Sequence, residues 1–60
     1  MEALDNLLTE INNKTAEFKN NAALNLNGNK SAGARARKAS LELGKMFKEY
    51  RKKSIEAEKR

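Results

Sequence analysis

The fold of this 60-residue chain is decided by one stretch near its middle, Asn25-Leu26-Asn27-Gly28-Asn29. Glycine readily adopts the left-handed conformation in which many helices end. The side chain of Asn29 or of Ser31 can accept hydrogen bonds from the first backbone N–H groups of a new helix. We therefore expect one helix to end and another to begin here, with a loop at about residues 27–29.

Two segments with helical periodicity flank this loop. Their apolar and small residues are spaced alternately by four and three, as on one face of an α-helix that forms a heptad seam. The composition agrees, because Pro and Val are absent and Ala, Leu, Glu, Lys and Arg dominate. We expect helices over about 3–26 and 30–58. The first seam would hold Leu4, Leu8, Ile11, Thr15, Phe18 and Ala22, and the second Ala32, Ala36, Ala39, Leu43, Met46 and Tyr50.

The predicted fold is all-α: a coiled-coil-like antiparallel hairpin of two helices that makes up a single domain over residues 1–60. A chain this short buries only about 60% of its unfolded surface. The chain has no Cys and no His, which leaves self-association as the usual way to complete so small a core. We expect a homodimer or higher homo-oligomer, with two hairpins forming a four-helix bundle. The expected core and oligomer residues are Leu4, Leu8, Ile11, Phe18, Ala36, Ala39, Leu43, Met46, Phe47 and Tyr50.

Charge divides the chain at the same loop. Residues 1–29 carry two lysines against four acidic residues, a net charge of −2. Residues 30–60 carry eleven Lys and Arg against four Glu, a net charge of +7. A basic half on a small chain indicates a polyanionic partner, most often nucleic acid.

Heptad positions place most of these cations on one outer side of the second helix, with Glu42, Glu49 and Glu56 on a flank. The alternative is a solvated helix face with ion pairs such as Glu42 to Lys45. Lys30, Ser31, Arg35, Arg37 and Lys38 also gather at the amino end of this helix, where backbone N–H groups and the helix dipole favour phosphate. The candidate DNA-binding residues are Lys30, Ser31, Arg35, Arg37, Lys38, Lys45, Lys48, Arg51, Lys52 and Lys59.

Nothing in the sequence is typical of a base-reading motif, so we expect contact with the phosphate backbone of double-stranded DNA and little sequence specificity. Tyr50 and Phe47 could stack on bases, but their helical spacing favours the core. Leu41 and Ile55 fall among the cations of the outer side. They could form a second oligomer contact, or they could indicate that the assumed register is slightly shifted. Gly33 and Gly44 lower helix propensity, and they could permit a close approach of the two helices.

Other function classes find little support. Without His, Cys, clustered acids or a Gly-rich phosphate loop, we expect no enzyme activity, metal, cofactor or small-molecule substrate. No apolar run approaches membrane-spanning length and no signal peptide is evident, which predicts a cytoplasmic protein. A basic helix could attach to anionic membranes, but its apolar face is rich in Ala and lacks Trp.

Two segments resemble a known family: residues 28–43, which begin Gly28-Asn29-Lys30, and residues 47–59, which include Tyr50-Arg51-Lys52. They are similar to the GNK-x-A-x-x-R-x-R and YRK-x-SI-x-AEK segments of bacterial linker-histone-like nucleoid proteins of the chlamydial type. Residues 1–27 match only in helical character. The resemblance implies a nucleoid-associated protein that binds and condenses DNA.

Family members of the chlamydial kind carry a long Lys/Ala-rich tail after this domain, whereas this sequence stops at Arg60. We therefore expect the folded domain to bind DNA itself, and to compact, bend or bridge it as an oligomer. The alternative is a helical hairpin that serves oligomerisation or protein interaction without direct DNA binding.

Overall fold

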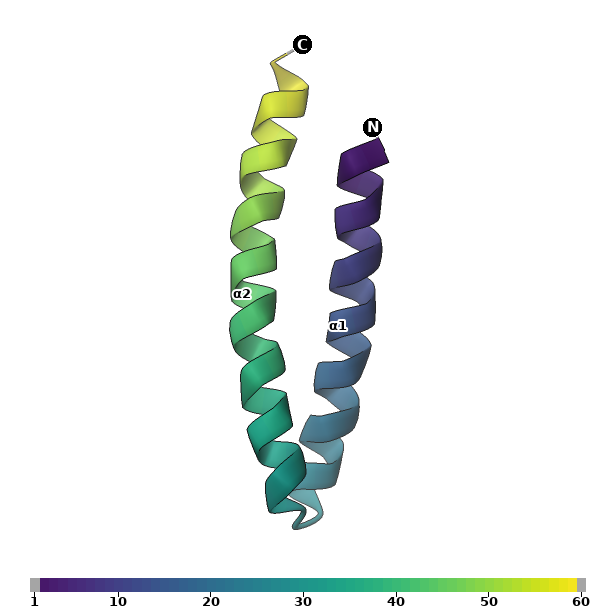
Figure 1. Cartoon of the computed structure of the whole chain (residues 1–60), viewed down its shortest axis with the longest axis vertical. Helices are drawn as coiled ribbons and strands as arrows, with labels where there is room; N and C mark the ends of the chain where they lie inside the picture. The colour runs from purple at the N-terminus through teal and green to yellow at the C-terminus, as the bar shows by residue number, and fades with distance from the viewer. Residues whose placement is uncertain (1, 60) are drawn as a thin grey trace.

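The computed structural model describes residues 2–59, apart from the side chain of Glu2. The chain forms helix α1, Glu2–Leu26, and helix α2, Lys30–Glu58. The two helices run antiparallel and pack along their length, and α2 extends beyond the start of α1 (Figure 1). The hairpin measures 49 × 15 × 11 Å. The predicted all-α class with two packed helices is confirmed, whereas the four-helix bundle stays a prediction.

The reversal at the end of α1 is a Schellman motif centred on Gly28. Gly28 has a φ of +99°, which L side chains rarely adopt. Its N–H donates to the carbonyl of Asn25 at 3.0 Å, and the N–H of Asn29 donates to the carbonyl of Leu24 at 3.0 Å. These two bonds satisfy carbonyl groups that the helix end would otherwise leave unpaired.

Helix α2 begins at once after this motif because Asn29 caps it. Asn29 has extended backbone angles, φ −83° and ψ 102°. Its side-chain oxygen accepts a hydrogen bond from the N–H of Ala32 at 3.0 Å. Of the two caps that the sequence allowed, the structure therefore uses Asn29 and places Ser31 inside the helix. A single glycine and a single asparagine fix both helix ends.

The buried seam of α2 follows the predicted spacing. Its buried residues are small near the loop and larger further along, and they include Ala32 and Ala39, which have no exposed surface. Met46 and Tyr50 continue the seam as half-buried residues. Because Ala side chains are short, the two backbones can approach closely near the loop. The full buried set of α2 is Ala32, Gly33, Ala36, Ala39 and Leu43.

The seam of α1 differs from the predicted one in one of its two rows, which begins at Leu7 and not at Leu8. Leu7 is buried at 4% exposure, whereas Leu8, the predicted core member, is 43% exposed. Phe47 on α2 is likewise 45% exposed rather than part of the hairpin core. Both residues lie one position beyond the seam, where the opposite helix covers them only in part. Leu4, Ile11 and Phe18 are half-buried.

Gly33 is explained by the residue that lies against it. A Cβ built on Gly33 would lie 2.8 Å from Cγ of Asn25 and closer still to its Nδ2. The same Nδ2 donates to the carbonyl of Asn29 at 3.2 Å, which holds the Asn25 side chain across the loop. Gly33 therefore leaves room for a side chain that connects α1 to the start of α2. Gly44, in contrast, has no atom within 4 Å of such a Cβ.

The two glycines should respond oppositely to substitution by alanine. Gly44→Ala should raise the free energy of unfolding by about 0.5–1 kcal/mol, since it gains helix propensity without a clash. Gly33→Ala should be at least about 1 kcal/mol less stable than Gly44→Ala, because Asn25 must move and lose its hydrogen bond. Urea unfolding followed by circular dichroism measures both. Equal gains from the two substitutions would contradict the Asn25 contact.

Candidate nucleic-acid interface

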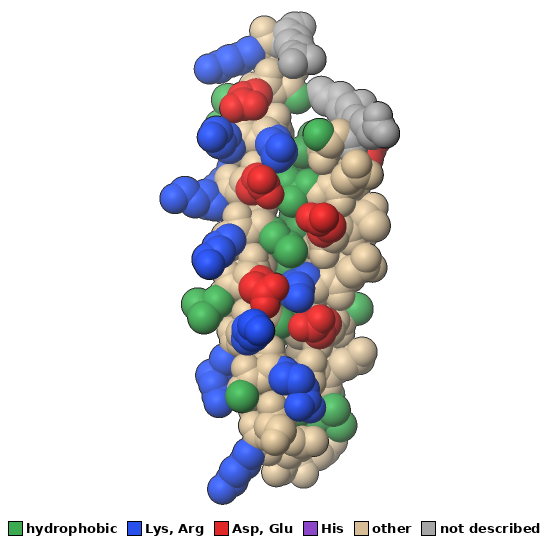
Figure 2. Space-filling view, viewed as in Figure 1, with side chains coloured by type: hydrophobic (Ala, Val, Ile, Leu, Met, Phe, Trp, Pro, Cys, Tyr) green, Lys and Arg blue, Asp and Glu red, His purple; other side chains and the backbone are tan. Residues whose placement is uncertain are grey.

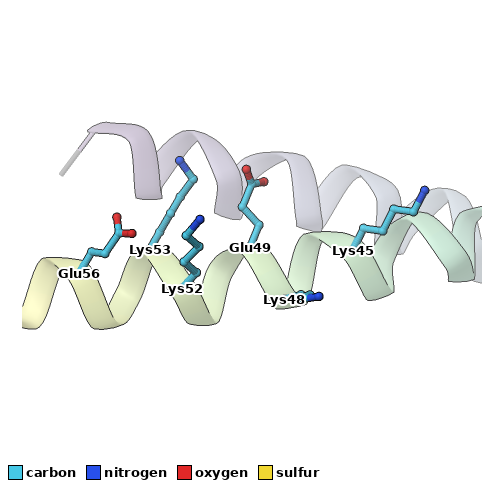
Figure 3. A pocket seen from close by; sticks show the side chains of 6 residues that line it. All are labelled: Lys45, Lys48, Glu49, Lys52, Lys53 and Glu56. Carbon is cyan, nitrogen blue, oxygen red and sulfur yellow. The ribbon is translucent and has the colours of Figure 1, made fainter.

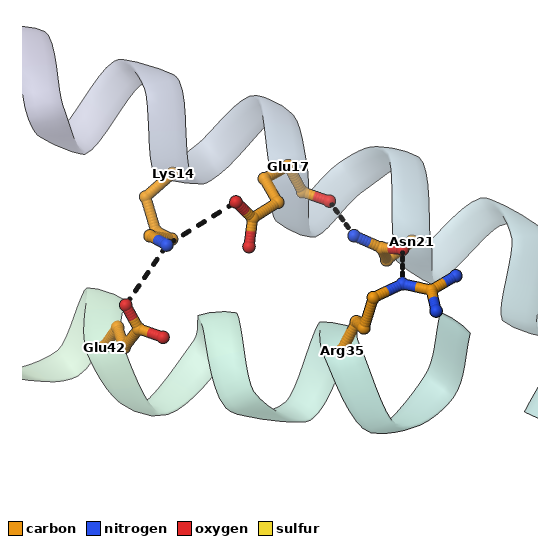
Figure 4. Close-up of polar contacts among 5 residues, drawn as sticks. All are labelled: Lys14, Glu17, Asn21, Arg35 and Glu42. Atoms are coloured by element: carbon orange, nitrogen blue, oxygen red, sulfur yellow. Dashed lines mark hydrogen bonds and ion pairs between the residues drawn. The ribbon is translucent and has the colours of Figure 1, made fainter. Parts of the chain in front are cut away.

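Two polar contacts join the helices along one flank and set their register (Figure 4). Lys14 Nζ lies 3.1 Å from Glu42 Oε2 and 3.5 Å from Glu17 Oε1. Further toward the loop, Arg35 Nε donates to Asn21 Oδ1 at 2.9 Å. Asn21 Nδ2 in turn donates to the carbonyl of Glu17 at 2.9 Å. In both pairs the two residue numbers add up to 56, as expected for two antiparallel helices that keep one register.

Lys14 is the cation that this flank holds most firmly. Its side chain is 21% exposed and touches two carboxylates. The hydrogen bond to Glu42, and then the charges of Glu17 and Glu42, raise the pKa of Lys14 above its ordinary value. Sequence reasoning missed this residue. The signal was present, because Lys14 and Asn21 follow Leu7 at intervals of seven and continue its row along the seam.

The outer face of α2 carries the predicted basic surface. All ten candidate DNA-binding residues are exposed. Lys and Arg side chains line the outer edge of α2 along almost its whole length, with carboxylates between this edge and α1 (Figure 2). Four of these lysines are spaced at seven-residue intervals, and we call them the lysine row: Lys38, Lys45, Lys52 and Lys59.

The cations of this face are not neutralised by neighbouring carboxylates. Within residues 3–59, the ion pairs of the structure are those of Lys14 with Glu17 and with Glu42. The intrahelical pairs that a solvated face would form, such as Glu42 with Lys45, are not among them. The ammonium groups of the lysine row are therefore available to an external anion.

An open hollow lies along the carboxy-terminal half of α2 (Figure 3). In Figure 3, Glu49 and Lys53 reach toward α1, whereas Lys48 points away from it. Lys53 was not among the predicted site residues, although its side chain is half-buried and lines the same hollow. Four ammonium groups against two carboxylates make the hollow net positive. Its lining residues are Lys45, Lys48, Glu49, Lys52, Lys53 and Glu56.

The predicted phosphate cluster at the start of α2 divides into two parts. Lys30, Arg37 and Lys38 are exposed on the outer side, whereas Arg35 is turned toward α1 by its bond to Asn21. Two N–H groups of the first turn already have partners, because Ala32 donates to the cap and Gly33 to the carbonyl of Asn29. A bound phosphate would therefore depend mainly on the side chains.

The first turn of α2 also contains no acidic residue. Cations at the amino end of a helix face the positive end of the helix dipole, which disfavours them. Their repulsion would be relieved by a bound anion. Within residues 3–59 no group of three or more potential metal ligands is present. Neither described helix is long and apolar enough to cross a membrane.

These features define a class of protein: a small helical hairpin that displays unpaired cations along one helix and has no metal cluster in its described part. Such a surface is typical of proteins that bind polyanions through charge. The chain belongs to the family described as histone H1-like protein Hc1, whose family model matches residues 5–60. The match confirms the resemblance seen in residues 28–59. No curated protein and no solved structure matches the chain.

This is a family of histone-like, structural DNA-binding proteins and not a family of enzymes. The family relationship supports DNA as the polyanion for which the exposed cations are suited. The family match does not identify the residues that would contact DNA, so the geometry of α2 has to assign them.

The Lys14–Glu42 contact should make the stability of the hairpin depend on alkaline pH. Because the folded-state pKa of Lys14 is raised, the stabilisation is complete below the ordinary lysine pKa of 10.5 and is lost as pH rises through the folded value. Wild type should exceed Glu42→Gln in free energy of unfolding by a constant amount between about pH 7 and 9, and by less above the ordinary lysine pKa. Urea titrations at each pH measure this. A gap that persists undiminished above that pKa would contradict the contact.

Proposed function

We propose that this protein binds the phosphate backbone of double-stranded DNA with the outer face of α2, and compacts, bends or bridges DNA as a homo-oligomer. The observation that carries the proposal is the lysine row, which is exposed and unpaired in a chain of the Hc1 family. Lysine is a compact point charge on a flexible stem and suits phosphate contacts that do not need a fixed geometry.

The distribution of charge supports contact with the backbone rather than with the bases. The lysine row repeats at seven-residue intervals along a rod, so it presents a line of charge and not a cluster of directed donors. Base reading needs side chains that reach base edges in a groove. The two aromatic residues of α2, Phe47 and Tyr50, lie on the other side of that helix from the lysine row, and Tyr50 is half-buried. Binding should therefore depend mainly on charge.

Affinity for random duplex DNA should fall steeply with salt. If about six phosphates are neutralised, the logarithm of the binding constant falls with the logarithm of salt concentration at a slope near −5. Fluorescence anisotropy of a labelled duplex across a salt series gives this slope. A flat response would exclude backbone binding.

Two variants of equal net charge locate the contact on the hairpin. Lys45→Gln with Lys52→Gln removes two positive charges from the lysine row, and Asn6→Asp with Asn13→Asp adds two negative charges to exposed positions on α1. The α2 variant should lower the magnitude of the salt slope by about 2, since each phosphate contact contributes about 0.9. The α1 variant should leave the slope close to that of wild type. The reverse order would place the DNA on α1.

A second pair of variants compares the two ends of α2. Arg37→Glu with Lys38→Glu and Lys52→Glu with Lys59→Glu change the net charge equally. The first pair should weaken binding more, because it lies in the amino-terminal half of α2, where several cations gather without an acidic residue in the first turn. Competition between the variants on one labelled duplex ranks their affinities. Equal losses would show a uniform line of charge without a phosphate cluster.

A second function has one observation in its favour. Large apolar residues remain exposed on the hairpin, including Leu41 at 73% and Ile55 at 54%. A helical hairpin that recruits another protein would use such residues, and it would need no DNA. The salt series separates the two functions, because a pure protein-interaction module would give no change in anisotropy with duplex DNA at any salt concentration.

A further inference from the structure

The hairpin has two flanks with opposite character. On one flank, Lys14 and Asn21 of α1 meet Glu42 and Arg35 of α2 through ion pairs and hydrogen bonds. The heptad positions on the other side of the seam form the second flank, which we call the uncharged flank. It consists of Leu8, Thr15 and Ala22 on α1 and Ser40, Phe47 and Ser54 on α2. None of these six side chains can carry a charge, although the sequence is 35% charged.

The uncharged flank carries a partly exposed apolar centre. Leu8 is 43% exposed and Phe47 is 45% exposed. The register of the facing pairs sets Leu8 level with residue 48, so Leu8 and Phe47 stand at nearly the same level on the two helices. Around them Thr15, Ala22 and Ser40 are small and would allow another helix to approach closely. The flank thus combines an apolar centre with short side chains, as the interfaces of helix bundles do.

The hairpin exposes more surface than a compact monomer of its mass, and the excess is large enough for an interface with another chain. The chain exposes 4809 Å². A compact monomer of its mass, 6.7 kDa, is expected to expose about 3,900 Å². The excess of about 900 Å² is close to the roughly 800 Å² that each partner buries in a standard interface.

The charges that border the flank favour an antiparallel second copy of this chain. Near the open end of the hairpin the border carries Asp5 and Glu58 together with Arg51, and near the loop it carries Lys19 and Arg37; all are exposed. Two copies related by a two-fold axis across the flank would bring the acidic residues of one open end to the cations of the other loop end. A parallel arrangement would bring like charges together.

We infer that the uncharged flank is the interface through which two copies of this chain associate, antiparallel, into a four-helix bundle. A polyanion has nothing to bind on this flank, whereas a second identical flank is complementary to it in shape and in border charge. The lysine row lies on the opposite side of α2 from Ser40 and Phe47. The dimer would therefore present two lysine rows on opposite sides, an arrangement that joins two DNA duplexes rather than coating one. This last step rests on the proposed function.

Sedimentation of the protein without DNA tests the interface separately from DNA binding. Wild type should sediment at twice the 6.7 kDa of one chain. Leu8→Ser with Phe47→Ser should raise the dissociation constant at least about 100-fold, because each dimer loses four apolar side chains. The matched control, Leu41→Ser with Ile55→Ser, removes two exposed apolar residues from the outer face and should leave it unchanged. A monomeric wild type, or equal dispersal by both variants, would overturn the inference.

Single-cysteine variants test the same interface without removing apolar side chains. The natural chain has no Cys, so a short bis-maleimide links only introduced thiols. Ser40→Cys, near the middle of the uncharged flank, should give covalent dimers, whereas its neighbour Leu41→Cys, on the outer face, should not. Dimers from Leu41→Cys alone would place the interface on the outer face and overturn the inference. Circular dichroism confirms that each variant keeps its helices.

Discussion

The main constraint on this structure is the small amount of apolar side chain that is buried between its two helices. Near the loop the buried side of α2 consists of Gly33 and three alanines, of which Ala32 and Ala39 have no exposed surface. Side chains this small contribute little hydrophobic free energy. The loop half of the seam therefore relies on close approach and on polar contacts. The Schellman motif and the Asn29 cap fix the chain reversal at the end of the hairpin where the buried side chains are smallest.

This constraint explains the polar residues of the α1 seam. Lys14 and Asn21 stand where a long coiled coil would have leucines, and each meets a partner across the seam, Glu42 and Arg35 respectively. Polar residues at seam positions lower stability but specify register. A shift of α1 by one turn would separate both pairs at once.

The sequence predicted much of this fold because the decisive signals were local. Gly28 acts through its own backbone and Asn29 through a side-chain hydrogen bond to Ala32, three residues away. The α2 seam follows from its four-and-three spacing, apart from the exposed Phe47. The α1 seam was harder to predict, since Leu7 and Leu8 are adjacent and a purely apolar criterion cannot choose between them. The choice depends on the partner of Lys14, which is distant in sequence. The role of Gly33 likewise depends on Asn25 across the loop.

The candidate site shows the same division between local and distant information. The exposure of the cations follows from heptad positions alone, and the structure agrees for all ten candidates. The orientation of Arg35 does not follow from them, because Asn21 on the other helix determines it. Lys30 lies in the first turn of α2, which contains no acidic residue, and its charge is disfavoured there by the positive end of the helix dipole. An anion bound beside Lys30 would reduce this repulsion, so the same charge that limits the stability of the free hairpin would favour the proposed binding of phosphate.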